Sequence, residues 1–104
     1  MKKSKVSKIL NKKFKKVSEF YEKDWDNVNE TWIVKSKTNI TGTFIVCDSE
    51  TKEVQLIKRK HNKKGEVKSY KILENYSIKT CNKKDLRKLI SIAKNIKKKE
   101  YAKH

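Results

Sequence analysis

The chain has 104 residues, enough for one domain with a single modest core and too few for two such domains. Charged residues make up 39% of it and hydrophobic residues 35%, which approaches the composition of disordered chains. Nine aromatic residues and ten isoleucines nevertheless predict a folded centre. A formal net charge of +17 makes the chain repel itself, so the composition predicts a polyanionic partner, with nucleic acid as the first candidate.

The sequence predicts neither a membrane segment nor a cofactor site. No apolar run approaches the length of a membrane span, and the basic start of the chain is not followed by the apolar stretch of a signal peptide. We therefore expect a cytoplasmic protein without membrane contact. Cys47 and Cys81 form no CxxC pair and stand far from both histidines in sequence. This spacing predicts free, buried thiols in a reducing compartment, with a disulfide or a metal site as the alternatives.

The first predicted element is an amphipathic helix over residues 4–23, marked by apolar residues at three- and four-residue intervals. The first 16 residues hold eight lysines and no acid, an order that opposes the helix dipole. A sequence shaped only for helix stability has the reverse order, so the lysines indicate an anionic ligand. A solvated basic face without a specific partner is the alternative. An acidic connection follows over residues 24–30.

A β-rich middle is predicted over residues 31–80. Gly42, in a predicted turn over residues 38–42, can take a positive φ. We also expect a short fifth strand over residues 76–80, after a turn at residues 74–75. Because the strands carry apolar residues on both faces, they predict a sheet covered on both sides or a small barrel.

The most distinctive stretch runs from Val54 to Leu73, where two strand-like runs are joined by a short loop that contains Gly65. Five of the eight residues from Lys58 to Gly65 are basic. This pattern predicts a β-hairpin, or ribbon, with a strongly charged tip.

A second amphipathic helix is predicted over residues 83–99, with Asn82 as its N-cap and Asp85 three residues later. The sequence as a whole therefore predicts a single α+β domain over residues 1–104. Its order is an N-terminal helix, an antiparallel meander of four or five strands or a small barrel, and a C-terminal helix.

Two short stretches resemble known nucleic-acid-binding families. Residues Gly42 to Asp48 (GTFIVCD) are similar to the glycine-x-hydrophobic-x-x-hydrophobic-aspartate segment of Sm-like barrels, although the asparagine that follows in their RNA-binding motif is missing. The order of ribbon and then helix, with Thr80 before the helix, resembles the arm-binding domains of phage and transposon integrases. Both resemblances imply a small β module that binds nucleic acid.

An enzyme alternative comes from Glu66 and Lys68, which resemble the E-x-K element of restriction-type nucleases, with Asp48 upstream as a metal ligand. Glu66 directly follows the loop glycine and Asp48 ends a strand, so neither carboxylate is set in a shared cleft. We therefore expect no catalytic residue, no metal and no cofactor. His61 has no partner of catalytic type and is predicted to lie near phosphate.

The basic residues are 27 lysines and two arginines. Lysine is a flexible point charge suited to phosphates, whereas reading guanine favours the bidentate fork of arginine. We therefore expect a non-enzymatic protein that binds the backbone of duplex DNA in preference to RNA, with Arg59 as the best candidate to contact a base or a narrow minor groove. The residues predicted to bind nucleic acid are Lys58, Arg59, Lys60, His61, Lys63 and Lys64 on the ribbon, Lys5, Lys8, Lys12 and Lys15 near the N-terminus, and Lys84, Arg87 and Lys88 on the last helix.

Small basic proteins of this composition are common in phages and mobile elements, so an accessory or regulatory DNA-binding role is the expected setting. One alternative is an RNA-binding or ribonucleoprotein component in which Tyr70 or Tyr76 stacks on bases. The other is a phage-type inhibitor protein whose partner is a host enzyme.

Overall fold

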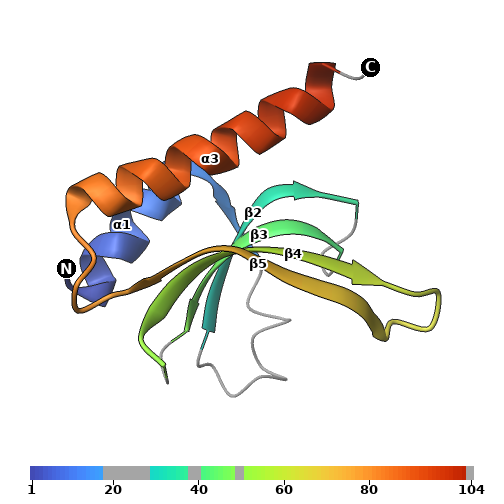
Figure 1. Ribbon diagram of the computed structural model, residues 1–104, viewed down its shortest axis with the longest axis horizontal. Helices are drawn as coiled ribbons and strands as arrows, with labels where there is room; N and C mark the ends of the chain where they lie inside the picture. Colours follow the sequence, from blue (N-terminus) through green and yellow to red (C-terminus); the bar gives the residue numbers. More distant parts are fainter. Residues whose placement is uncertain (18–28, 38–40, 49–50, 103–104) are drawn as a thin grey trace.

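The computed structural model describes residues 1–17, 29–37, 41–48 and 51–102 (Figure 1). It has the predicted α+β order of a helix, an antiparallel sheet and a second helix. The helices are α1 (Lys3–Lys13) and α3 (Lys83–Ala102). The strands are β1 (Lys15–Lys16), β2 (Asn29–Ser36), β3 (Gly42–Asp48), β4 (Glu53–His61) and β5 (Val67–Ser77), and they lie in the sheet in this order.

The sheet is open, so the small barrel that the sequence allowed is wrong. All four pairings between neighbouring strands are antiparallel, and among the described strands β1 pairs with β2 alone and β5 with β4 alone. A strand of two residues is too short to close a barrel against the eleven residues of β5. Both edges of the sheet are therefore left without a strand partner in the described chain.

Helix α1 ends at Lys13, whereas the sequence predicted a helix through residue 23. Phe14 is extended, with φ −136° and ψ 154°, yet its ring remains in the core at 7% exposure. Strand β1 follows at once and pairs with β2, with Lys15 opposite Ile33. In this conformation the backbone after Phe14 is paired with β2 in place of the next helical turn, and Phe14 stays buried. The rest of the predicted helix lies outside the described residues, as does most of the acidic connection.

The predicted turn at residues 74–75 and the separate strand after it are also wrong. Strand β5 continues through this region to Ser77 because a β-bulge absorbs one residue. Leu56 of β4 lies opposite Glu74, but the next residue, Ile57, lies opposite Ile72, so Leu73 is the extra residue. The fifth strand of the sheet is instead β1.

Both helices cover one face of the sheet (Figure 1). The main core lies between the helices and the sheet. In it, Trp32 of β2 is fully buried and donates its indole N–H to Oδ1 of Asn11 at 2.8 Å. Burial of each large side chain of this kind stabilises the fold by roughly 1.5–3 kcal/mol. The other core residues are Val6, Leu10, Phe14, Val34, Ile45, Cys47, Val54, Leu56, Ile78, Cys81, Leu86, Leu89, Ile90 and Ala93.

A smaller cluster lies on the opposite face of the sheet. It contains Phe44, Val46 and Ile57, with Ile33 packed against them, and Phe44 and Ile57 are fully buried. The alternation of apolar residues on both faces of the strands predicted this two-sided burial.

Helix α3 begins with the predicted cap. The N–H of Asp85 donates to Oδ1 of Asn82 at 2.9 Å, and the N–H of Asn82 donates to Oδ2 of Asp85 at 3.2 Å. The two residues thus satisfy each other's free amides, as in a capping box. The helix starts at residue 83 as predicted and extends to Ala102.

The carboxylate of Glu30 in β2 ties α1 and β1 to the sheet. It accepts a hydrogen bond from the hydroxyl of Ser7 at 2.7 Å and forms an ion pair with Nζ of Lys16 at 3.1 Å. Partial burial opposes ionisation of this carboxyl group, but the Ser7 hydrogen bond and the Lys16 charge outweigh it. The pKa of Glu30 is therefore lowered from its ordinary value of 4.5.

Glu30→Gln keeps an acceptor for Ser7 and removes the charge. A carboxyl group with a lowered folded pKa contributes stability above its unfolded pKa, so we expect the variant to be less stable than the wild type at neutral pH. As the pH falls below about 4.5, through the folded pKa of Glu30, the wild type loses this contribution and the two stabilities converge. Urea unfolding at a series of pH values measures this, and a constant difference down to acid pH would contradict it.

Gly42, the first residue of β3, has the positive φ that the sequence predicted, +148°. A Cβ atom there would lie 2.3 Å from the carbonyl oxygen of Lys35 and 2.6 Å from Cα of Ser36, so a side chain collides with the backbone of β2. We expect Gly42→Ala to lower the free energy of unfolding by about 3 kcal/mol or more, because backbone strain and strand displacement add together. Urea denaturation measures this change.

Gly65→Ala is the matched control. Gly65 also has a positive φ, +85°, but a Cβ atom there meets nothing within 4 Å. Its expected cost is about 1–2 kcal/mol, from the backbone conformation alone. Equal losses in the two variants would contradict the steric role of Gly42.

Candidate nucleic-acid interface

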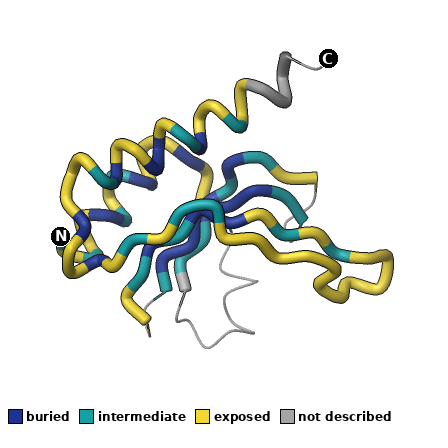
Figure 2. Tube along the Cα trace, viewed as in Figure 1, coloured by how far each residue is buried: buried dark blue, intermediate teal, exposed yellow. Residues whose placement is uncertain are grey.

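Strands β4 and β5 project from the sheet as a two-stranded ribbon (Figure 1). Strand β3 begins at Gly42, which lies opposite Arg59, so among the described strands none lies beside the ribbon beyond Arg59. Figure 2 shows that this part is mostly exposed, whereas β4 has buried residues nearer the helices and β5 has intermediate ones there. The predicted ribbon is thus confirmed as a structural element.

The ribbon tip is a tight turn built around Asn62. The N–H of Gly65 donates to the carbonyl oxygen of Asn62 at 3.0 Å, and Oδ1 of Asn62 accepts from the N–H groups of Lys64 and Glu66 at 2.9 and 3.0 Å. Gly65 supplies the positive φ that closes such a turn. Lys63 and Lys64 therefore occupy its two central positions, and both are exposed.

The ribbon has two different faces, because side chains alternate along each strand. One face, which we call the lysine face, carries the cross-strand pairs Lys58–Lys71 and Lys60–Ser69. The other, which we call the tyrosine face, carries Ile57–Ile72, Arg59–Tyr70 and His61–Val67. Lys58 and Lys60, which the sequence predicted to contact phosphates, are exposed, and so is Lys71, which was not among the predicted contacts.

Arg59 differs from the lysines in being held against the protein. The central carbon of its guanidinium group lies 4.6 Å from the centroid of the Phe44 ring, and its Nε is buried with no hydrogen-bond partner among the described residues. Burial lowers the pKa of Arg59. The side chain therefore has to leave Phe44 before it can take the base-reading role that the sequence suggested.

His61 is also anchored. Its backbone N–H donates to Oγ1 of Thr41 at 3.1 Å, and its ring Nδ1 lies 3.1 Å from the same hydroxyl group. These contacts tie the start of the free ribbon to the residue that precedes β3.

The predicted basic residues outside the ribbon are also exposed, but they lie elsewhere. Helix α1 and the ribbon tip are at opposite ends of the long axis of the molecule (Figure 1). The two helices are brought together, whereas the ribbon tip stands apart from α1. These exposed residues are Lys5, Lys8 and Lys12 on α1, Lys15 on β1, and Lys84, Arg87 and Lys88 on α3.

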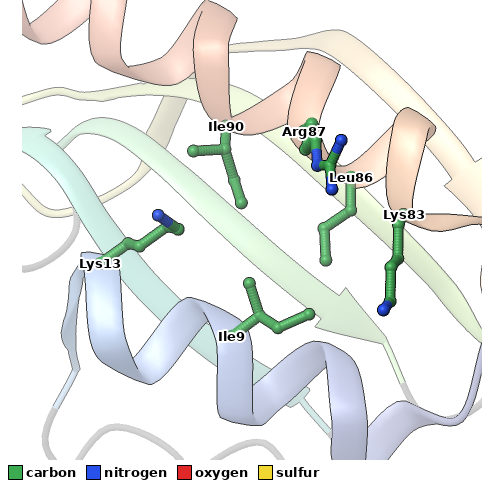
Figure 3. Close-up of a pocket in the computed structure, with 6 residues that line it drawn as sticks. All are labelled: Ile9, Lys13, Lys83, Leu86, Arg87 and Ile90. Atoms are coloured by element: carbon green, nitrogen blue, oxygen red, sulfur yellow. The ribbon is translucent and has the colours of Figure 1, made fainter.

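A groove between α1 and α3 encloses a cavity of about 220 Å³ (Figure 3). Ile9, Leu86 and Ile90 line it with apolar surface, and three cations complete its lining. Of these, Arg87 was predicted to bind nucleic acid, whereas Lys13 and Lys83 were missed. Their spacing held the signal, since Lys13 follows Ile9 by four residues and Lys83 precedes Leu86 by three.

The carboxylates of the nuclease alternative do not meet. Asp48 lies opposite Glu53 at the end of β3, whereas Glu66 lies at the ribbon tip, beyond the other end of that strand. Six residues of strand separate Asp48 from Gly42 alone, which is about 20 Å. Within the described ranges, no group of three or more histidine, cysteine, aspartate or glutamate side chains could hold a metal ion.

Cys47 and Cys81 are free and buried, as the sequence predicted. Burial raises the pKa of the Cys47 thiol to about 11 and also raises that of Cys81. Both thiols are therefore protonated at neutral pH. Since the thiolate is the nucleophile and the metal ligand, neither cysteine is suited to either task in the folded protein.

No protein-family model matches the chain, and no match was found among curated proteins or solved structures. Across the described residues, no helix combines the length and the apolar character needed to cross a membrane. The candidate site is therefore defined by the ribbon and by the surface of α1 and α3 alone.

Removal of the contact between Arg59 and Phe44 is expected to destabilise the fold by a measurable amount. We expect Arg59→Ala to lower the free energy of unfolding by about 1–2 kcal/mol, because it removes the cation–π contact and the packing of the side-chain stem. Lys60→Ala is the control on the exposed face, with an expected change within about 0.5 kcal/mol. Urea unfolding compares the two, and equal effects would contradict the anchoring of Arg59.

Proposed function

We propose that this protein is a non-enzymatic DNA-binding protein that contacts mainly the phosphate backbone, through the tip and lysine face of the ribbon. The observation that carries the proposal is the concentration of exposed cations on a projecting element with only one acid, Glu66. These cations are Lys58, Lys60, Lys63, Lys64, Lys68 and Lys71.

The chemistry of lysine supports backbone contact. Each ammonium group is a mobile point charge that binds a phosphate oxygen without a fixed orientation, so it adds affinity but little base specificity. A two-stranded ribbon also has the width that the major groove of duplex DNA admits. Neutralised phosphates release counterions, so the proposed binding is strongly dependent on salt.

The surface of α1 and α3 supplies a second set of phosphate contacts in this proposal. Lys5, Lys8 and Lys12 on α1 and Arg87 on α3 are exposed, as is the tip at the far end of the long axis. A DNA molecule that contacts both sets runs along the length of the protein.

The proposed setting is the cytoplasm, as an accessory or regulatory factor of a phage or mobile element. The small size and net charge of +17 support this role. A protein partner, such as a host enzyme, is the second candidate function. The groove between α1 and α3 favours it, because an apolar floor with cations around it suits an acidic protein segment.

The salt dependence of DNA binding tests the role of the tip. For duplex DNA, the plot of log binding constant against log salt changes in slope by about 0.9 for each phosphate contacted. We expect the double variant Lys63→Glu, Lys64→Glu to make this slope shallower by about 2 and to weaken binding at low salt by roughly tenfold or more. Fluorescence anisotropy across a salt series measures both quantities.

The matched control is Lys52→Glu, Lys79→Glu, which changes the net charge equally. Lys52 and Lys79 are exposed at the other end of the ribbon strands, where the N–H of Ile78 donates to the carbonyl oxygen of Lys52 at 2.8 Å. We expect this pair to have the smaller effect. Equal weakening would contradict a specific role of the tip, and absence of salt-dependent binding by the wild type would contradict DNA binding.

A further inference from the structure

The tyrosine face carries an apolar patch that the phosphate contacts do not use. Val67, Tyr70 and Ile72 of β5 are 57%, 51% and 48% exposed, and they are the large hydrophobic side chains that lie open on the described surface. Their cross-strand partners occupy every second position of β4, so all three side chains belong to one face. These partners are His61, Arg59 and Ile57. Since β5 is an edge strand, the patch is accessible from the side as well as from above.

Tyr70 lies between Val67 and Ile72 on β5, at the centre of this patch, and has Arg59 beside it on β4. Its cross-strand partner is Arg59, which is itself held 4.6 Å above the ring of Phe44. Burial raises the pKa of Tyr70, the Arg59 charge opposes the rise and the Asp48 charge adds to it, so the phenol is neutral at physiological pH. The arrangement presents a neutral, half-exposed aromatic ring with a cation beside it.

The positive charge around the patch restricts the kind of ligand that can bind there. Lys63, Lys64 and Lys68 are exposed nearby on the tip and on β5, so the occupant has to combine anionic groups with flat apolar surface. A second copy of the chain has a net charge of +17 and is repelled. A nucleic-acid strand with unpaired bases has both properties, whereas the bases of an intact duplex keep their faces stacked on one another.

We propose that Tyr70 stacks on an unpaired base of a nucleic-acid strand whose phosphates lie along Lys63, Lys64 and Lys68. This inference depends on the proposed function and narrows its substrate to DNA with a single-stranded region. Base stacking on aromatic side chains tolerates any sequence, because every base has a π-face, while adjacent cations hold the backbone.

The test compares the binding of a labelled oligo(dT) strand and of a duplex of the same length by fluorescence anisotropy. We expect Tyr70→Ala to weaken binding to the single strand by roughly tenfold and to leave duplex binding unchanged. Tyr70→Phe keeps the ring and is expected to retain most of the single-strand affinity. Because Tyr70 is half exposed, both variants are expected to fold, and circular dichroism with thermal unfolding verifies this.

The double variant Lys63→Glu, Lys64→Glu removes phosphate contacts that both proposals share. It is therefore expected to weaken binding to the single strand and to the duplex, unlike Tyr70→Ala. An oligo(U) strand tests the source of the base, and tighter, Tyr70-dependent binding to it would support the site with RNA as its ligand. Loss of single-strand and duplex affinity alike in Tyr70→Ala, or of neither, would overturn the inference. Self-association of the wild type that Tyr70→Ala abolishes would also overturn it, in favour of a second copy.

The failure of this inference differs from the failure of DNA binding itself. Single-strand binding that is indifferent to Tyr70, together with salt-dependent duplex binding that requires Lys63 and Lys64, refutes the stacking site and leaves the proposed function in place. Absence of salt-dependent binding to every strand refutes both.

Discussion

The pairing of β4 with β5 is the interaction on which the rest of the molecule depends. Near the helices, its strands bury Val54, Leu56 and Ile57, which join the two sides of the core. Farther out the same pairing continues with little burial, and a two-stranded ribbon alone is only marginally stable in water. Two contacts compensate for this: Arg59 packs on Phe44, and His61 bonds to Thr41. The buried half of the pairing therefore holds the exposed half in a defined direction.

The basic side chains lie where the fold cannot neutralise them. Lys16 forms an ion pair with Glu30, but this pair lies on β1 and β2, at the other edge of the sheet from β5. The lysines on the tip and on the lysine face remain solvated, so their mutual repulsion is moderated by water and salt but not removed. An anionic ligand that approaches the ribbon relieves this repulsion in addition to forming its own contacts.

The sequence predicted the elements whose signals are local. Asn82 and Asp85 marked the start of α3 because the cap is formed within four residues, and two strand-like runs on either side of the loop with Gly65 marked the ribbon. The sequence-based prediction failed where contacts between residues distant in sequence determine the local structure. The spacing of Phe14 fitted a helix, but pairing with β2 made the following residues a strand. Likewise the bulge at Leu73 depends on the register of β4.

The same limit applied to the candidate site. Arg59 had the appearance of a free cation in the sequence, because its contact with Phe44 exists only once β3 is aligned beside β4. The exposure of Tyr70 likewise depends on β5 being an edge strand, which the sequence did not specify. The exposure of the ribbon lysines follows from their charge, whereas the second, apolar face of the ribbon required the complete sheet.

The two faces of the ribbon together restrict the path of any strand that uses both. On the β4 side, β3 closes off the base of the ribbon, since Gly42 lies opposite Arg59. On the β5 side no strand intervenes in the described chain, and Lys68 is the extra residue of a second bulge, between the pairs Lys60–Ser69 and His61–Val67. In the proposed complex, a nucleic-acid strand that stacks on Tyr70 and also contacts the lysine face passes around the open β5 edge, where Lys68 is exposed. The bulge thus adds an exposed cation on the strand that such a ligand has to pass.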